Sequence, residues 1–211
     1  ITKYNISLWN TVPQLADLLI DGAEINKIKL GIKLFLLSGD WIPLKLPEKI
    51  AKNCSEAEVV SLGGATEGSI WSIWYKINRV NPAWSSIPYG TPMPNQKMYI
   101  LDSVGQFVPV GAIGEIHIGG AGVALNYWGD EERTKASFFT NPTLGRLYKT
   151  GDCGKWNKSG YIEFVGRNDF QVKINGYRVE LGEIEKTLNS YPGVKQSLVL
   201  ANSKNISDGT T

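Results

Sequence analysis

The N-terminal third of the sequence alternates strand and helix patterns, and this alternation limits the possible folds more than any other feature. Apolar stretches at 6–9, 32–39 and 57–64 predict strands, with helices predicted between them at 11–22 and 46–54. The second stretch is apolar on both faces, as in strands of a buried parallel sheet. This order predicts an open parallel sheet covered by helices, with ligands expected beyond the carboxyl ends of its strands.

The first predicted helix has its ends and one face marked by particular residues. Thr11 is a candidate N-cap and Gly22 a candidate stop. Leu15, Leu18 and Leu19 fall on one face, which makes the helix amphipathic.

From about residue 70 the sequence is rich in strand patterns separated by turns that contain Pro and Gly. We expect these strands to form a small, distorted barrel or sandwich appended to the sheet. A short helix is predicted at 130–139, with Asp130 as its cap. The predicted strands are 70–77, 96–102, 114–120 and 161–166.

A second unit is predicted to begin near residue 169. Two strand patterns flank Asn175-Gly176, a dipeptide typical of two-residue hairpin turns, and residues 182–191 predict an amphipathic helix. Because the sequence begins without Met and ends in a polar turn, we expect a piece of a larger protein. The predicted fold class is α/β, with one domain over 1–168 (α/β over 1–69, β-rich over 70–168) and part of a small α+β domain over 169–211.

Composition argues against several classes of function. The formal net charge is +2 and no block of Lys and Arg occurs, so we expect no nucleic-acid or membrane partner. No apolar run approaches the ~20 residues of a membrane span. Cys54 and Cys153 lie far apart and His117 is the single histidine, which makes a zinc site improbable and suggests reduced thiols in a cytoplasmic protein.

The segment 61–71 combines a Gly pair with Thr66 and Glu67 before it turns apolar. Glycine permits tight turning and close approach of another group, and the two polar side chains offer a hydroxyl and a carboxylate. The plain alternative is a strand that ends in a polar turn. The place of the segment after a predicted strand favours a ligand site.

Asp152 and Arg167 are further candidates. Asp152 lies in a Thr-Gly-Asp turn, where it could bond the local backbone or present two acceptor oxygens to a ribose. Arg167 lies near the predicted domain boundary, where it could bind phosphate or form a surface ion pair of little value. The Gly-rich stretch 119–125 lacks the Gly-Lys-Ser/Thr ending of a phosphate loop, and His117 is expected to be a half-buried strand residue without a chemical role.

Four segments, GGATE, GEIHIGGAGVALNYW, YKTGD and GRNDFQVKINGYRVELGEIE, occur in this order over nearly the whole chain. Together they resemble the core motifs of the adenylation domains of nonribosomal peptide synthetases, within the adenylate-forming ligase superfamily. The resemblance implies the C-terminal part of a large adenylation core, followed by the start of a mobile lid domain. It also implies ATP-dependent activation of an amino acid with Mg²⁺, and transfer of the acyl group to the phosphopantetheine thiol of a peptidyl carrier protein beside neighbouring synthetase domains.

The resemblance assigns roles by motif. Thr66, Glu67 and Arg167 would be the catalytic residues: Thr66 and Arg167 would contact the nucleotide, and Glu67 would ligate Mg²⁺. Asp169 would be the hinge, and Gly176 would face the pantetheine path. The nucleotide-binding set would be Gly63, Gly64, Ala65, Thr66, Asp152, Phe164 and Arg167.

The sequence departs from the family pattern at Gly63, where many members have an aromatic residue that stacks on adenine, and at Phe164, which is often Tyr. The family's phosphate loop and the aspartate that pairs with the substrate amino group would precede residue 1, and its adenylation lysine would follow residue 211. These 211 residues alone are therefore predicted to be inactive.

The resemblance also places a substrate pocket that is mostly apolar, with one amide and one hydroxyl. Such a pocket disfavours a charged side chain, which would lose its hydration without gaining a partner. The pattern resembles that of cysteine-selecting domains, so L-cysteine is the predicted substrate, with Trp71 and Leu36 as ordinary core residues the alternative. The pocket residues would be Asn10, Leu36, Ser38, Leu62, Ile70 and Trp71.

Two rival interpretations remain. The chain could belong to a free-standing acyl- or aryl-CoA ligase, or to a non-catalytic platform that binds a carrier protein. A dinucleotide-binding module is disfavoured because no G-x-G-x-x-G opens a helix.

Overall fold

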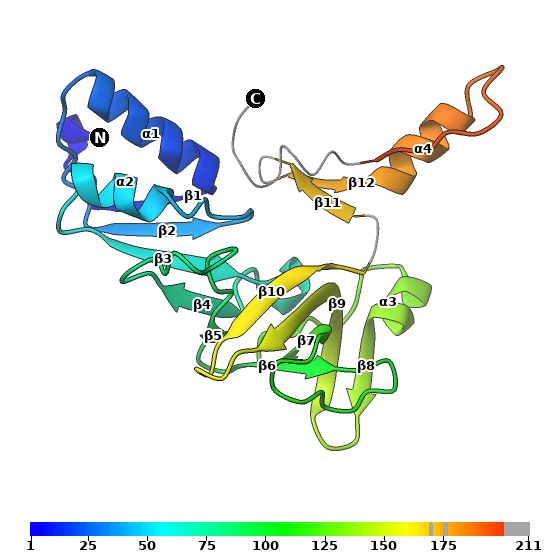
Figure 1. Ribbon diagram of the computed structural model, residues 1–211. Coiled ribbons are helices and arrows are strands. Elements are labelled where there is room, and N and C mark those ends of the chain that lie inside the picture. Colours follow the sequence, from blue (N-terminus) through cyan, green and yellow to red (C-terminus); the bar gives the residue numbers. More distant parts are fainter. Residues whose placement is uncertain (169–170, 175–176, 201–211) are drawn as a thin grey trace. The chain divides into compact units, whose positions relative to one another are not determined.

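The computed structural model describes residues 1–168, 171–174 and 177–200 (Figure 1). The chain divides into two compact units, each of which is described here by itself. Among the described residues, no helix has the length and apolar character needed to cross a membrane. The first unit comprises 1–57, 80–86 and the described residues from 171 onward, and the second comprises 58–79 and 87–168.

The first unit begins with a parallel pair of strands and two helices. Strand β1 (Leu8–Thr11) pairs in parallel with β2 (Leu34–Ser38), so Asn10 lies opposite Leu36. A short 3-10 turn, η1 (Thr2–Tyr4), precedes β1. The helices are α1 (Pro13–Ile25), between the two strands, and α2 (Leu46–Asn53), after β2. The predicted β-α-β-α order and the parallel pairing of its first two strands are confirmed.

Helix α1 differs from the prediction at both ends. Thr11 is the last residue of β1, and Val12 precedes the helix without a side-chain cap. Pro13 supplies a preset φ and has no N–H that needs a partner, so the helix begins there without help from a side chain. Gly22 lies inside the helix, which continues to Ile25.

The buried face of α1 is also not the leucine face. Leu15 and Leu18 are 53% and 65% exposed, whereas Ile20 is fully buried. The elements that pack against a helix decide which of its faces is buried, and the leucine pattern alone does not reveal them. The buried residues of α1 are Pro13, Ala16, Ile20 and Ala23.

The C-terminal elements of the first unit are a hairpin and a helix. Strands β11 (Gln171–Ile174) and β12 (Tyr177–Glu180) pair antiparallel, and α4 (Leu181–Asn189) follows. The predicted hairpin and helix are therefore confirmed. The connecting Asn175-Gly176 and the predicted hinge Asp169 lie outside the described residues.

The second unit begins with β3 (Glu58–Gly63), which pairs antiparallel with β4 (Ile73–Lys76), and β4 pairs with β5 (Thr91–Pro92). Between β3 and β4 lies a 3-10 turn, η2 (Thr66–Gly68). The polar segment 63–67 therefore follows directly on a strand, as predicted.

An antiparallel sheet makes up most of the second unit (Figure 1, green to yellow). Its order is β10-β9-β7-β6, with β8 also paired to β9, so the strands form an open sheet and not the barrel that we expected. Helix α3 (Glu131–Ser137) contacts β8 and β9, and the Asp130 side chain caps it by accepting from the Arg133 N–H at 2.9 Å, as predicted. The strands are β6 (Gln96–Leu101), β7 (Gly114–Gly120), β8 (Phe138–Asn141), β9 (Gly145–Trp156) and β10 (Ile162–Arg167).

The core of the second unit is apolar and draws on β4 and on all five strands of the larger sheet. Within β7, His117 is 2% exposed, so it is fully buried and not half-buried as its alternating sequence suggested. Strand β7 is covered on both sides, which removes the difference between its inward and outward positions. The core residues are Ile73, Met98, Ile100, Ile116, Ile118, Phe138, Tyr148 and Ile162.

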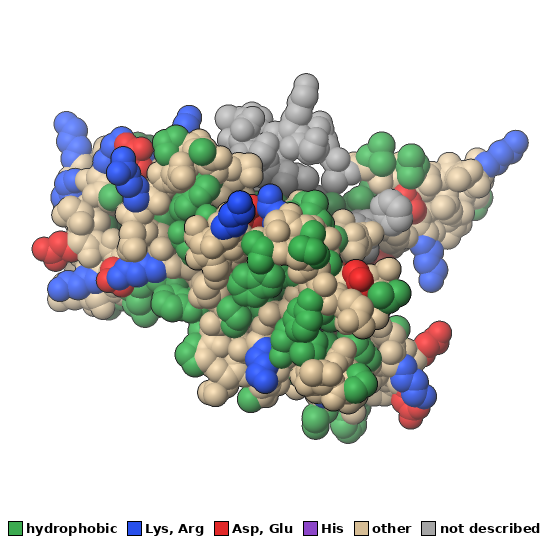
Figure 2. Space-filling model, turned by 60° about the horizontal axis from the view of Figure 1, so that its bottom comes forward, with side chains coloured by type: hydrophobic (Ala, Val, Ile, Leu, Met, Phe, Trp, Pro, Cys, Tyr) green, Lys and Arg blue, Asp and Glu red, His purple; other side chains and the backbone are tan. Residues whose placement is uncertain are grey.

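Several large hydrophobic side chains of the second unit remain exposed, among them Val104, Phe107, Val110 and Ile113 in the segment between β6 and β7. Figure 2 shows several separate patches of hydrophobic side chains at the surface, with Lys and Arg side chains among them. Single exposed apolar side chains are common on protein surfaces, whereas large continuous patches are typical of contact surfaces.

Candidate functional site

The turn after β3 depends on glycine. Gly64 has a φ of +144°, and a Cβ on it would lie 2.7 Å from the Ser72 backbone nitrogen and 2.8 Å from the Ile70 carbonyl oxygen. The Ser72 N–H donates to the Gly63 carbonyl at 2.8 Å, which closes the turn. A side chain at residue 64 would therefore open the loop that carries Thr66 and Glu67.

The 3-10 turn η2 is anchored to the Gly-rich loop that follows β7. The Ala124 N–H donates to the Glu67 carbonyl at 2.8 Å, and Ser69 Oγ donates to the Gly122 carbonyl at 2.8 Å. The Gly68 carbonyl accepts from Ser72 Oγ at 2.9 Å. These bonds fix the backbone of η2 and leave the Thr66 side chain at the surface.

Glu67 is the unusual side chain of this turn, because it is a carboxylate that is only 6% exposed. Its Oε1 accepts from the Tyr127 hydroxyl at 2.5 Å. Its Oε2 is buried and has no hydrogen-bond partner among the described residues. A buried carboxylate oxygen without a partner is costly, and a bound cation is one way to satisfy it.

A second part of the site lies on β9 and β10. Arg167 Nη1 donates to Asp152 Oδ1 at 2.5 Å, and Arg167 Nη2 donates to the Thr150 carbonyl at 3.1 Å. The Asp152 N–H donates to Thr150 Oγ1 at 3.0 Å. The two charged side chains are only 14% and 15% exposed, so this ion pair is shielded from water and is not a surface pair.

A β-bulge places Arg167 opposite Asp152. The register between β9 and β10 shifts between Phe164 and Gly166, and Gly166 has a φ of +156°. Bulges turn a strand locally and redirect the side chains that follow. Gly166 therefore permits the bulge, and the bulge brings Arg167 opposite Asp152; the sequence motif does not show this.

Tyr89 connects the two parts, and the sequence analysis missed it. Its ring stands edge-to-face on Phe164 at a centroid distance of 5.7 Å. A Cβ on Gly63 would lie 2.0 Å from Tyr89 Cε2, so the ring fills the space beside that glycine. Burial raises the pKa of Tyr89, and the charge of Asp152 raises it further. Together these two effects exceed the lowering effects of a hydrogen bond to the Gly64 backbone and of the Arg167 charge. The signal that could have revealed this residue is Gly63 itself, a glycine in a place where the family often has a ring.

The nucleotide-site candidates of the second unit are thus distributed around one aromatic ring. Gly63 and Phe164 both lie beside the Tyr89 ring, and Gly64, Asp152 and Arg167 are near enough to influence its hydroxyl. Thr66 and Glu67 continue directly from the glycine pair.

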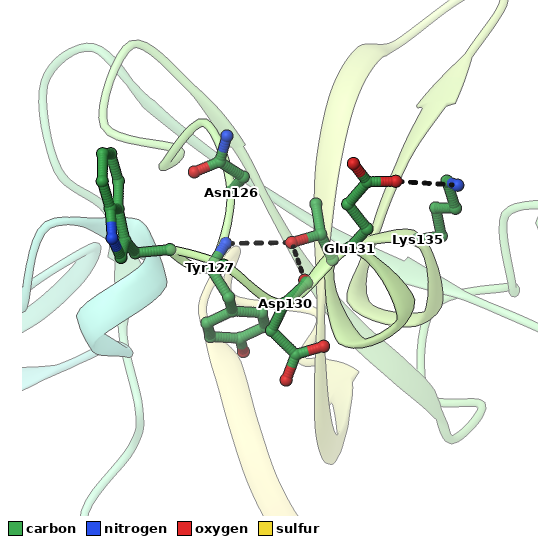
Figure 3. A pocket seen from close by; sticks show the side chains of 8 residues that line it. Asn126, Tyr127, Asp130, Glu131 and Lys135 are labelled. Atoms are coloured by element: carbon green, nitrogen blue, oxygen red, sulfur yellow. Dashed lines mark hydrogen bonds and ion pairs between the residues drawn. The ribbon is translucent and has the colours of Figure 1, made fainter.

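A surface pocket beside α3 forms a separate candidate (Figure 3). Thr134 Oγ1 accepts from the Tyr127 N–H at 3.0 Å and donates to the Asp130 carbonyl at 2.6 Å, while Lys135 pairs with Glu131 at 3.4 Å. Several of its polar groups are therefore bonded to one another, and none of the predicted site residues lines it. The lining residues are Asn126, Tyr127, Trp128, Gly129, Asp130, Glu131, Thr134 and Lys135.

The predicted substrate residues divide between the two units. Asn10 and Leu36 are opposite partners on β1 and β2, and Ser38 ends β2. In the second unit Leu62 is buried, and Trp71 is half-buried. The sixth, Ile70, is 64% exposed and has a φ of +69°, a conformation that is strained for a β-branched side chain. Their assembly into one pocket stays a prediction.

Comparisons with known proteins agree with this description. The profile of the family described as AMP-binding enzyme matches residues 1–128. The chain is 52% identical over 198 residues to bacitracin synthase 1 of Bacillus licheniformis, covering 94% of this chain and 4% of that protein. The chain spans less than a fifth of the length of the curated relatives at the head of this comparison.

Solved structures are also similar. The nonribosomal peptide synthetase FmoA3 with bound α-methyl-L-serine-AMP is 41% identical, with a TM-score of 0.76 over 86% of this chain and 20% of that chain. Holo-PA1221, which contains adenylation and PCP domains and a bound vinylsulfonamide inhibitor, is 28% identical, with a TM-score of 0.81 over 90% of this chain and 33% of that chain. The mixed α/β fold is therefore that of part of these adenylation proteins.

Proposed function

Since the chain belongs to the AMP-binding enzyme family, we propose that it forms part of an adenylation domain of a nonribosomal peptide synthetase. The domain would join an amino-acid carboxylate to the α-phosphate of ATP, release pyrophosphate, and pass the acyl group to a phosphopantetheine thiol. The observation that carries this proposal is the arrangement of the glycine turn, Asp152 and Arg167 around Tyr89, with Glu67 in the same turn and the same compact unit.

The proposed roles follow from the chemistry of each group. The backbone of Gly63, Gly64 and Ala65 would approach the nucleotide closely, and the exposed Thr66 hydroxyl would bond its phosphate. Asp152 would accept from the ribose hydroxyls, with Arg167 holding it in place and contacting the ribose or phosphates. Phe164 and Tyr89 would supply the aromatic surface beside the nucleoside.

The residues present fit a magnesium ion. Glu67 would be the carboxylate ligand through its Oε2, which is buried and has no hydrogen-bond partner among the described residues. Mg²⁺ commonly binds proteins through one or two carboxylates and takes its other ligands from phosphates and water. When bound, the ion would neutralise charge on the phosphates.

L-Cysteine is the proposed substrate. The support is the mostly apolar set formed by Leu36, Leu62, Ile70 and Trp71, with Asn10 and Ser38 as its polar members. A short, uncharged side chain suits such a lining, because a charge would be desolvated without a partner.

The proposed organisation has the adenylation core over 1–168 and the start of the mobile domain over 169–211. Asp169 would act as the hinge and Gly176 would face the pantetheine path. The partner would be a peptidyl carrier protein in a cytoplasmic synthetase, which the similarity to an adenylation and PCP protein supports. The chain alone would be inactive, because the family's phosphate loop and adenylation lysine are not among its residues.

Amino-acid-dependent ATP–pyrophosphate exchange, measured on the full-length protein that contains this chain, tests the proposal. Cysteine is compared with serine, alanine, valine and leucine, and Glu67→Gln is the inactive control. Exchange dominated by cysteine would support both the reaction and the substrate. Exchange with another amino acid would keep the reaction and refute the substrate, and no exchange would favour the non-catalytic platform.

A further inference from the structure

The Tyr127 hydroxyl donates to Glu67 Oε1 at 2.5 Å, between residues that are 60 positions apart. Tyr127 lies in the segment between β7 and α3, whereas Glu67 lies in η2. The resemblance gives Tyr127 no role, yet its hydroxyl bonds the buried Glu67 carboxylate.

The hydrogen bond between Tyr127 and Glu67 can run in one direction only. An ionised carboxylate accepts hydrogen bonds and has none to donate, so the phenol is the donor. The hydroxyl of Tyr127 has a single proton, and this bond uses it.

The ring of Tyr127 is held from several sides. Phe138 packs edge-to-face on it at a centroid distance of 5.5 Å, and the Arg133 guanidinium lies 4.5 Å from its centroid. The Tyr127 N–H donates to Thr134 Oγ1 at 3.0 Å (Figure 3). The phenol is therefore fixed by α3 and β8, and it can hold Glu67 in one orientation.

The two carboxylate oxygens of Glu67 consequently have different surroundings. Oε1 is taken by Tyr127, and Oε2 is buried without a partner among the described residues. We propose that Tyr127 is a positioning residue, which binds one oxygen of Glu67 and thereby presents the other oxygen to a divalent cation. This inference rests on the proposed function, because it requires Glu67 to be the metal ligand.

The test uses Mn²⁺ as the probe on the full-length protein with a non-hydrolysable ATP analogue, and follows free Mn²⁺ by electron paramagnetic resonance. Tyr127→Phe keeps the ring and removes the hydroxyl. We expect it to weaken Mn²⁺ binding about tenfold, the lower end of the effect of removing a residue that orients a metal ligand. Tyr99→Phe, which alters a ring on β6 that packs on Phe107, is the matched control and should leave Mn²⁺ affinity unchanged.

A second measurement separates positioning from general damage to the site. AMP binding is measured in EDTA, where no metal contributes. A positioning role predicts that Tyr127→Phe lowers Mn²⁺ affinity and leaves AMP affinity within about twofold of wild type, since the hydroxyl would act on the metal ligand alone. Equal losses of both affinities, or no loss of either, would overturn it.

Glu67→Gln distinguishes this inference from the proposed function. If Glu67→Gln weakens Mn²⁺ binding and Tyr127→Phe does not, the positioning role fails while the metal site stands. If Glu67→Gln has no effect, the metal role of Glu67 fails and the inference fails with it. Should Tyr127→Phe not fold, Thr134→Val removes the hydroxyl that bonds the Tyr127 N–H and is expected to weaken Mn²⁺ binding two- to fivefold; unchanged binding would count against the inference.

Discussion

Arg167 and Asp152 are directly opposite each other on β10 and β9, and the Arg167 guanidinium bonds both the Asp152 carboxylate at 2.5 Å and the Thr150 carbonyl at 3.1 Å. The predicted Thr-Gly-Asp turn is wrong, because these residues lie inside β9, and one arginine holds this part of the strand through two separate acceptors. The carboxylate that we assign to the ribose is therefore set in place by a neighbouring strand.

Replacing Arg167 with Lys should lower AMP affinity about tenfold or more. Lysine keeps the charge, but it lacks the planar fork that reaches two acceptors at once. Calorimetric titration of the full-length protein with AMP measures the effect, and Arg79→Lys, at an exposed position in the segment after β4, is the control. Wild-type affinity in Arg167→Lys would show that charge alone suffices.

Gly63→Ala should destabilise the protein by about 1–3 kcal/mol, the usual range for overpacking a filled site. The new Cβ would lie 2.0 Å from Tyr89 Cε2, and an aromatic ring in contact with Phe164 has little room to move. The melting temperature measures the change. The double variant Gly63→Ala/Tyr89→Ala should lose less stability than the two single losses added, because the clash is removed. Additive losses would mean that the two residues do not interact.

Stability should decline as pH falls below about 6.5, partly because of His117. Burial lowers the pKa of His117 from its ordinary 6.5; Glu115 opposes this decrease through its backbone carbonyl and its charge, and Lys149 adds a smaller decrease. Between the folded and unfolded pKa values the unfolded chain binds more protons, so stability is present above the unfolded pKa and is lost as pH falls toward the folded pKa.

The measurement is the difference in melting temperature between pH 7.5 and pH 5.5 for the wild type and His117→Gln. The variant should show a smaller difference, since it has no imidazole to protonate. An identical pH dependence in both proteins would remove His117 as a cause.

Trp71→Ala should erode the selectivity of ATP–pyrophosphate exchange without abolishing it. Trp71 is half-buried beside the end of the η2 segment, and we assign it to the substrate pocket. Enlarging an apolar pocket changes discrimination between similar side chains by about 1–3 kcal/mol, or roughly 10- to 200-fold. The ratio of exchange rates with cysteine and leucine measures it. A constant ratio would place Trp71 in the core and outside the pocket.

The sequence determined the order and kind of most elements and the candidate residues of the site. Apolar periodicity located β1, β2, β3, α2 and the β11–β12 hairpin, and Asp130 marked the start of α3, because these signals act between residues close in the chain. The contiguous segment from Gly63 to Glu67 was identifiable for the same reason.

The tertiary structure decided what depends on residues far apart in sequence. Tyr89 fills the space beside Gly63, and Tyr127 bonds Glu67 from 60 positions away. Packing also buried the face of α1 that carries Ile20 in place of its exposed leucines, and it left the β6–β10 sheet open. Local patterns state which side chains prefer burial, but the partner that buries or bonds each one is fixed only when distant segments are packed together.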